Sequence, residues 1–234
     1  MKKILVFDIG TGESKIGFAG DESPVFIFPT IVGRPKYNRK IHGLDLDNAT
    51  QKIMAVGFEC NGGIHNISYP IENGQIKDWD GIKAIFDYAF ENLKLEDDIS
   101  NYGIVLTDSI YSNKFSRRRV ADMLFNQYRI KAFYIDFQPY YSFISKEGLA
   151  TGILVEIGDG ITQIFPCYKG NPDIKGMRRF PIGGLIITDY LMKNLNTQVF
   201  NKNHLKDISK IKEKYCRVSY NYEEEIQNIQ PIQF

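Results

Sequence analysis

The sequence predicts an α/β protein with two related lobes, and two observations support this fold class. Short apolar runs that are typical of strands alternate with segments in which apolar residues recur every three or four positions, the spacing of amphipathic helices. A glycine-rich turn between two strands also occurs twice, as "FDIGTGESKIGFAG" from Phe7 and as "VEIGDGITQIFPCYKG" from Val155. The copies begin about 150 residues apart, which is a domain's length. The repeat therefore predicts one such turn in each lobe.

The individual elements follow from local patterns. Strands are predicted at residues 3–7, 15–18, 25–28, 102–106 and 132–135. Apolar residues from Ile82 to Leu93 predict an amphipathic helix that begins near Asp80, and those from Val120 to Tyr128 predict another. Pro139 suits the first turn of a third helix. Further helices are predicted at residues 184–195 and 205–217, whereas the final stretch with three consecutive glutamates is expected to be an incomplete element.

These elements divide the chain into a first lobe at residues 1–138 and a second lobe at residues 139–234. The segment beginning at Pro139 leads into the second glycine-rich turn, so it is expected to link the lobes. A polar stretch rich in glycine and asparagine predicts a subdomain inserted in the first lobe at about residues 31–68.

The chemistry of the first turn suits a phosphate group. Glycine lets a backbone approach a ligand closely, so the amides of Gly10, Thr11 and Gly12 can donate to phosphate oxygens. Lys15 offers a cation and Asp8 a carboxylate for a metal ion. The same pattern also fits an ordinary hairpin in which glycine supplies a positive φ. The second copy decides for the phosphate interpretation, because it has an acid at the position that matches Asp8.

In the second copy, Glu156 matches Asp8, and Gly158, Asp159 and Gly160 repeat the Gly-x-Gly pattern. Two such turns predict a nucleotide between the lobes, with a divalent cation between the paired carboxylates.

Composition narrows the class of protein. The 234 residues carry a formal net charge of +1, so no nucleic-acid partner is expected. The run from Arg117 to Arg119 is interpreted as the solvated start of a helix. Cys60, Cys167 and Cys216 lie far apart, which argues against a disulfide framework or a zinc site. Without a leader or a long apolar run, the sequence predicts a cytoplasmic protein that does not enter a membrane.

Six stretches resemble, in order and spacing, the signatures of actin and the actin-related proteins. They are "FDIGTGESKIGFAG", "FPTIVGRPK", "YPIENGQIKDWDGI", "LVEIGDGITQIFPCYKG", "ITDYLMKNL" and "IKEKYC". Three further stretches, "EGLATG", "MRRF" and "YCRVSYNYEEE", resemble the actin-related subunit of the actin-branching complex. The resemblance implies duplicated ribonuclease-H-like lobes of the actin-like ATPase fold around a nucleotide cleft, with the second lobe incomplete.

The same resemblance assigns roles to individual residues. Asp8 and Glu156 would face Mg²⁺, and Gln138 and Gln163 would lie beside the attacking water. ATP would contact Gly10, Thr11, Gly12, Lys15, Gly158, Asp159, Gly160, Gly184, Lys212 and Glu213. The partners implied are actin or actin-related subunits of the cytoskeleton.

Some residues depart from the family pattern. Glu156 replaces an aspartate, and Gln163 replaces a histidine that helps to position water. The family commonly has charged residues at the positions of Leu185, Ile186, Lys206 and Ser209, so fewer polar contacts to adenine are expected.

Three functions remain open on these grounds. The first is an ATP-binding cytoskeletal protein that takes part in actin filament assembly or branch nucleation and is at most a slow ATPase. The second is a structural subunit of an actin-related complex that binds nucleotide weakly or not at all. A small-molecule kinase of the same superfamily is disfavoured by the GRP and YPIENG stretches.

Overall fold

The computed structural model describes residues 3–36, 54–145, 151–195 and 205–228. The chain forms two compact units, Met1–Ile187 and Thr188–Phe234. The predicted boundary between lobes, at residues 138 and 139, lies inside the first unit. The division into two lobes therefore stays a prediction, although both glycine-rich turns belong to one compact unit.

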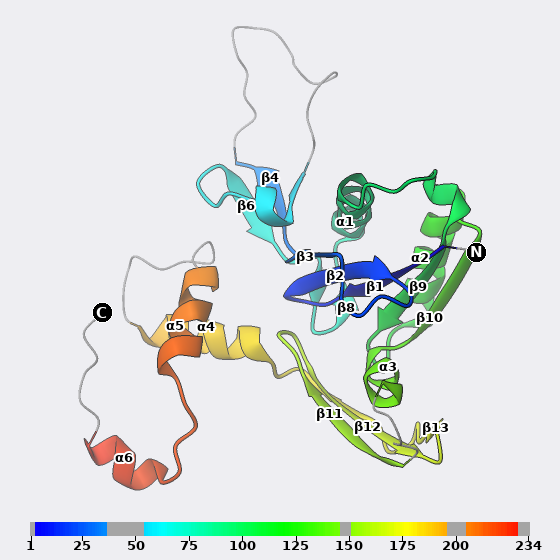
Figure 1. Ribbon diagram of the computed structural model, residues 1–234. Helices are drawn as coiled ribbons and strands as arrows, with labels where there is room; N and C mark the ends of the chain where they lie inside the picture. The colour runs from blue at the N-terminus through cyan, green and yellow to red at the C-terminus, as the bar shows by residue number, and fades with distance from the viewer. Residues whose placement is uncertain (1–2, 37–53, 146–150, 196–204, 229–234) are drawn as a thin grey trace, which may run out of the picture. The chain divides into compact units, whose positions relative to one another are not determined.

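The first unit contains a five-stranded sheet (Figure 1). Its strands, in spatial order, are β10 (Ala132–Phe137), β9 (Gly103–Asp108), β1 (Ile4–Ile9), β2 (Glu13–Phe18) and β3 (Phe26–Pro29). The strands β1, β9 and β10 run parallel, whereas β2 and β3 are antiparallel to their neighbours. All five predicted strands are confirmed, with ends that differ by a few residues.

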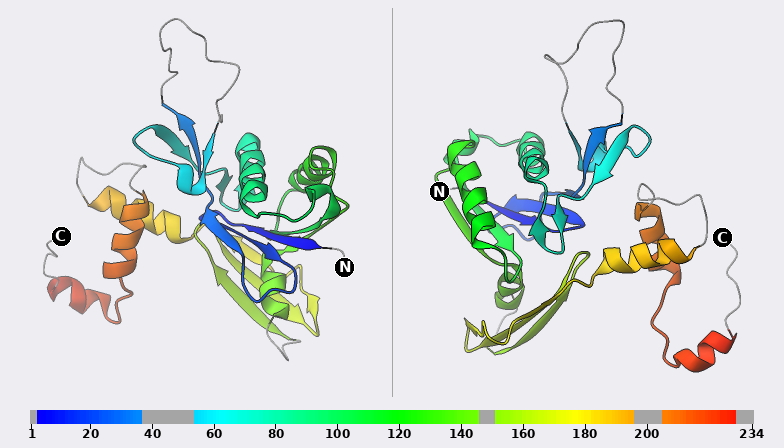
Figure 2. Two further views of the ribbon diagram at one scale, coloured as in Figure 1. Left: turned by 45° about the horizontal axis from the view of Figure 1, so that its top comes forward. Right: turned by 180° about the vertical axis from the view of Figure 1, so that it is seen from behind.

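Helices α1 (Trp79–Asn92) and α2 (Lys114–Asn126) cover one face of this sheet (Figure 2). Each begins at a polar residue that caps its first turn: the Asp78 side chain accepts a hydrogen bond from the Gly81 amide, and that of Asn113 accepts one from the Phe115 amide. The buried core between sheet and helices includes Leu5, Phe7, Ile16, Phe28, Ile85, Phe86, Ile104, Val120 and Leu124. Both helices confirm the predicted stripes, although α2 begins six residues before the first apolar residue of its stripe.

Strand pairing places the polar residues of the first turn on the opposite face. Phe7 and Ile16 pair across β1 and β2 and are both fully buried on the helix side. Since side chains alternate along a strand, the next pair, Asp8 and Lys15, lies on the other face. The predicted metal-binding carboxylate and the predicted phosphate-binding cation are therefore direct cross-strand neighbours.

A second sheet contains β11 (Gly152–Ile157), β12 (Thr162–Tyr168), β13 (Asn171–Pro172) and β14 (Arg178–Phe180). Helix α3 (Gln138–Ile144) packs on it, around a core of Ile110, Phe143, Phe165, Cys167 and Met177. The antiparallel arrangement of β1, β2 and β3 occurs again in β11, β12 and β14. The sheets differ otherwise, so the repeat is visible as a three-stranded unit, and duplication of whole lobes stays a prediction.

Short elements form the described parts of the predicted insertion at residues 31–68. A small sheet has the order β5 (Ala55–Val56), β4 (Val32–Pro35) and β6 (His65–Ser68), and a 3₁₀ turn η1 follows at Gly57–Glu59. The middle of the insertion lies outside the described residues. A second 3₁₀ turn, η2, lies at Ile99–Asn101.

The hairpin of β7 (Ile71–Glu72) and β8 (Gln75–Ile76) turns at Asn73 and Gly74, which have φ values of 49° and 65°. Positive φ at both central residues is what an Asn-Gly turn favours.

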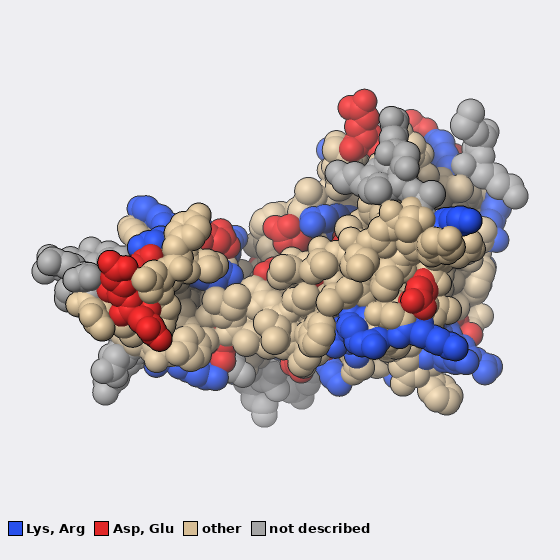
Figure 3. All heavy atoms as spheres, turned by 90° about the horizontal axis from the view of Figure 1, so that it is seen from below, with Lys and Arg blue, Asp and Glu red and all other residues tan. Residues whose placement is uncertain are grey.

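Helix α4 (Gly184–Asn194) begins in the first unit, and α5 (Leu205–Tyr215) and α6 (Tyr222–Asn228) belong to the second. The first two were predicted from the sequence. Helix α6 corrects the expectation of an incomplete element near the end. Glu223, Glu224 and Glu225 lie in its first turn, where acidic side chains favour a helix, and acidic atoms gather over it in Figure 3. Among the helices of the described residues, none has the length and apolar character that a membrane crossing requires.

Candidate functional site

A cavity of about 400 Å³ lies inside the first unit, where residues of both sheets meet. Most of the residues predicted to act in catalysis, nucleotide binding or metal binding are found at its wall. They are Asp8, Gly10, Thr11, Gly12, Lys15, Gln138, Glu156, Gly158, Asp159, Gly160 and Gln163. The structure thus brings together segments that are far apart in the sequence.

The two glycine-rich turns are closed by matching backbone hydrogen bonds. The Gly10 amide donates to the Glu13 carbonyl at 3.0 Å, and the Gly158 amide donates to the Ile161 carbonyl at 2.9 Å. Each bond closes its turn at the corresponding position of the repeat. In this structure the amides of Gly10 and Gly158 are thus used within the turns, and their contacts to phosphate stay predictions.

The two glycine-rich turns approach each other closely. A Cβ atom at Gly12 would lie 1.7 Å from Asp159 Oδ2, and one at Gly160 would lie 2.2 Å from Thr11 Oγ1. A side chain at Gly12 or Gly160 would therefore require the side chain of Asp159 or of Thr11 to move. The first turn therefore faces the second, and the glycine pattern is explained by this contact as well as by access to a ligand.

Strand β9 holds the first carboxylate in place. Thr107 Oγ1, at the carboxyl end of β9, donates to Asp8 Oδ1 at 2.5 Å. Lys15 is the cross-strand neighbour of Asp8, so a cation and a carboxylate lie beside the same turn. Thr107 was not predicted as a site residue, because its role depends on the pairing of β9 with β1.

Helix α3 and strand β12 hold the second carboxylate. Ser142 Oγ donates to Glu156 Oε1 at 3.0 Å, and Gln163 Nε2 donates to Glu156 Oε2 at 3.2 Å. Burial raises the pKa of Glu156, and the charge of Asp8 raises it further. The hydrogen bonds from Ser142 and Gln163 and the charge of Lys15 oppose this rise. Asp8 and Glu156 are thus close enough to repel each other electrostatically.

These residues fit a nucleotide-bound Mg²⁺. Within the described residues there is no group of three or more His, Cys, Asp or Glu side chains that can hold a metal ion. Mg²⁺ is usually bound through one or two carboxylates together with phosphate oxygens and water. Asp8 and Glu156 match that requirement, and a cation between them would relieve their repulsion.

Gln138 and Gln163 were both predicted to lie beside an attacking water. Gln138 is the first residue of α3 and lines the cavity. Gln163 also lines it, but it is 2% exposed and both ends of its amide have protein partners. The water-orienting roles stay predictions.

The predicted contacts to the nucleoside involve Gly184, Lys212 and Glu213. The Gly184 amide donates to the Gly158 carbonyl at 3.0 Å, so the start of α4 is joined to the second turn. In the second unit, Lys212 Nζ donates to Thr188 Oγ1, and Glu213 Oε1 accepts from Ser209 Oγ. Their predicted contacts to a nucleoside stay predictions.

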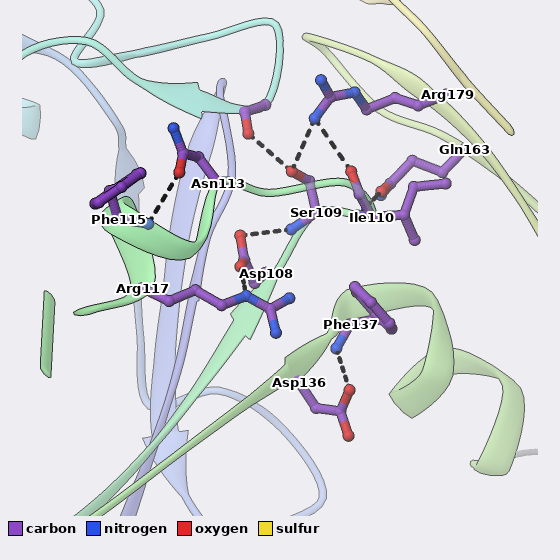
Figure 4. Close-up of polar contacts among 11 residues, drawn as sticks. Asp108, Ser109, Ile110, Asn113, Phe115, Arg117, Asp136, Phe137, Gln163 and Arg179 are labelled. Carbon is purple, nitrogen blue, oxygen red and sulfur yellow. Dashed lines mark hydrogen bonds and ion pairs between the residues drawn. The ribbon is translucent and has the colours of Figure 1, made fainter. Parts of the chain in front are cut away.

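Sequence reasoning missed a polar network in the loop after β9 (Figure 4). Ser109 Oγ donates to the Gly74 carbonyl at 2.8 Å, and Arg179 Nη1 donates to the Ile110 carbonyl at 3.1 Å. The loop is thereby fastened to the β7–β8 hairpin on one side and to β14 on the other. No local sequence signal identifies these contacts, since each joins distant segments.

The interpretation of Arg117 as a solvated residue is wrong, because its side chain pairs with Asp108 at the end of β9. Arg117 Nε lies 2.7 Å from Asp108 Oδ2, and its guanidinium lies 5.0 Å from the centre of the Phe137 ring (Figure 4). Burial raises the pKa of Asp108, although a hydrogen bond with Ser112 and the charge of Arg117 act in the opposite direction. The pair therefore joins α2 to the end of β9 beside the cavity.

Replacing Arg117 with methionine is expected to lower the free energy of unfolding by about 1–3 kcal/mol, because Asp108 would lose its charged partner. The pKa of Asp108 in the folded chain is already raised, so its ionised form opposes folding increasingly as the pH rises through that pKa. The loss should therefore be larger at pH 7 than in acid, as measured by urea unfolding at several pH values. Arg118→Met is the matched control, because Arg118 is exposed and lies 3.9 Å from Asp122. Equal losses in both variants would contradict a role for the Asp108 pair.

Comparison with known proteins shows the family of the chain. The family model described as Actin matches residues 2–232. The chain belongs to the actin family. It is similar to Actin-related protein 2 of Caenorhabditis briggsae, with 33% identity over 231 residues, covering 96% of this chain and 57% of that protein. Membership of this family implies the ribonuclease-H-like fold of the actin-like ATPases. The chain spans little more than half the length of that relative.

Proposed function

We propose that this actin-family chain binds Mg-ATP in the cavity between its two glycine-rich turns. One observation carries the proposal: both turns line one cavity, and each is preceded by a carboxylate at the matching strand position. The triphosphate would lie between the turns, with Lys15 beside it and Asp8 and Glu156 toward the cation. When bound, Mg²⁺ would neutralise charge on the phosphates, and Asp8 and Glu156 would hold it in place.

We propose a cytoskeletal role in the cytoplasm, with actin or actin-related subunits as partners and with no nucleic acid or membrane involved. The similarity to Actin-related protein 2 supports this role. Within it, the motifs that resemble the branch-nucleating subunit favour filament assembly or branch nucleation. Phosphoryl transfer to water depends mainly on positioning and electrostatics, so the described groups are consistent with slow hydrolysis at most.

A structural subunit that binds nucleotide weakly is the second candidate. It is favoured by Leu185 and Ile186 at positions where the family commonly has charged residues, both in the first turn of α4. It is disfavoured by Asp8 and Lys15, which are retained and lie side by side at the cavity.

Replacing Asp8 or Lys15 with alanine is expected to weaken ATP binding by about 1–3 kcal/mol each, because each change removes one charge from the cavity. Calorimetric titration with ATP in the presence of Mg²⁺ measures this loss. Lys83→Ala is a control for the loss of one positive charge, because Lys83 lies on α1 in an exposed pair with Asp87. Wild-type affinity in both site variants would show that the two turns do not hold the phosphates, whereas no measurable binding by the wild-type chain would favour the structural subunit.

A further inference from the structure

We propose that Gln163 and Ser142 are positioning residues that orient the Glu156 carboxylate toward the divalent cation. The proposal rests on the proposed function, because it requires that a metal ion accompanies the nucleotide. It differs from the expectation drawn from the family pattern, in which Gln163 acts directly on a water molecule.

The Glu156 carboxylate is held at both of its oxygen atoms. Ser142 Oγ, on α3, donates to Oε1 at 3.0 Å, while Gln163 Nε2, on β12, donates to Oε2 at 3.2 Å. The two donors come from different elements, so they restrict rotation of the carboxylate about its own axis. Glu156 and Gln163 are also direct cross-strand partners, which fixes the distance between their backbones.

The orientation of the Gln163 amide is itself determined by the backbone. Gln163 Oε1 accepts a hydrogen bond from the Ile110 amide at 2.8 Å. Because a backbone amide only donates, it requires the carbonyl end of the glutamine and turns the NH₂ group toward Glu156. Ile110 is fully buried beside Phe165 and Met177, and Gln163 is 2% exposed. The Gln163 NH₂ group that donates to Glu156 is therefore fixed in orientation by a buried hydrogen bond.

The side chains of Glu156 and Gln163 have lengths that let them meet across the strands. The resemblance to actin implies that Glu156 stands in place of an aspartate and Gln163 in place of a histidine. The extra methylene of Glu156 brings its carboxylate within reach of both Ser142 and Gln163. Shortening Glu156 to aspartate would withdraw the carboxylate from at least one of these donors. The two departures from the family pattern therefore act together, and they preserve an oriented carboxylate at the cavity.

The test measures the affinity of the full chain for Mg²⁺ in the presence of ATP, alongside its affinity for ATP in EDTA. Gln163→Met, which keeps the approximate size but removes both polar ends, is expected to weaken Mg²⁺ binding about tenfold or more. Ser142→Ala should act in the same direction, and Ser142→Thr, which keeps the hydroxyl, should restore the affinity. In both Ser142 variants, ATP affinity without Mg²⁺ should stay within twofold of wild type.

The matched control is Ser145→Ala. Ser145 is the exposed residue that directly follows α3, and its hydroxyl donates to the Ser142 carbonyl rather than to Glu156. Its Mg²⁺ affinity should equal that of wild type. Unchanged Mg²⁺ affinity in both Gln163→Met and Ser142→Ala would overturn the positioning role while leaving ATP binding intact. An equal loss of ATP affinity with and without Mg²⁺ would also overturn it. If wild type binds no ATP at all, the proposed function fails first and the positioning role fails with it.

Discussion

Replacing Phe7 with alanine is expected to lower the free energy of unfolding by about 3–5 kcal/mol, the usual cost of a large cavity in a core. Phe7 is fully buried, and its ring centre lies 5.1 Å from that of Phe86 and 5.6 Å from that of Phe90. The packing also fixes the strand that carries Asp8. Because a domain's total stability is about 5–15 kcal/mol, this single change should remove much of it.

Urea unfolding followed by circular dichroism measures the effect. Val25→Ala is the control, since Val25 is 57% exposed just before β3 and its truncation should cost less than about 0.5 kcal/mol. Similar losses at Phe7 and Val25 would contradict the assignment of the core to the helix-covered face of the sheet.

Replacing Gly183 with alanine is expected to weaken ATP binding more than about tenfold and to destabilise the fold by about 2 kcal/mol. A Cβ atom at Gly183 would lie 2.5 Å from the Asp159 carbonyl oxygen and 2.6 Å from that of Gly158. Both atoms belong to the backbone of the second turn, so they cannot move aside as a flexible side chain does. The turn and the start of α4 must separate, and the hydrogen bond from Gly184 to Gly158 would be lost.

Gly103→Ala provides the matched control, because the same added methyl group would there be 3.6 Å from its nearest neighbour, the Ala132 Cβ. Calorimetric titration with Mg-ATP and thermal unfolding measure both effects. Wild-type affinity in the Gly183→Ala variant would show that the spacing between the second turn and α4 does not matter for the cavity. Loss of affinity in the Gly103→Ala variant as well would mean that the effect is not local.

Local sequence patterns predicted those parts of the fold that depend on local physics. The five strands of the first sheet and helices α1 and α3 follow from alternation, periodicity and a proline at a helix start. The glycine turns were found because their chemistry occurs twice. That repeat also identified Asp8 and Glu156, which the strand register then places at matching positions beside one cavity.

The missed contacts depend on the meeting of distant segments. Arg117 looked like a solvated residue because its partner, Asp108, lies at the end of a strand whose approach to α2 is set by packing. Ser142 carries no motif, and its role at Glu156 arises only because α3 packs against the second sheet. Helix α6 was missed because it has few apolar residues, so its sequence lacks the stripe by which the other helices were predicted.

If both glycine-rich turns bind one nucleotide, adding Mg-ATP to the full chain should slow amide hydrogen exchange in two separate segments. These are residues 9–15 and residues 157–163, and both should be protected at the same ATP concentration. Protection confined to one of the two segments, or found only elsewhere in the chain, would contradict it.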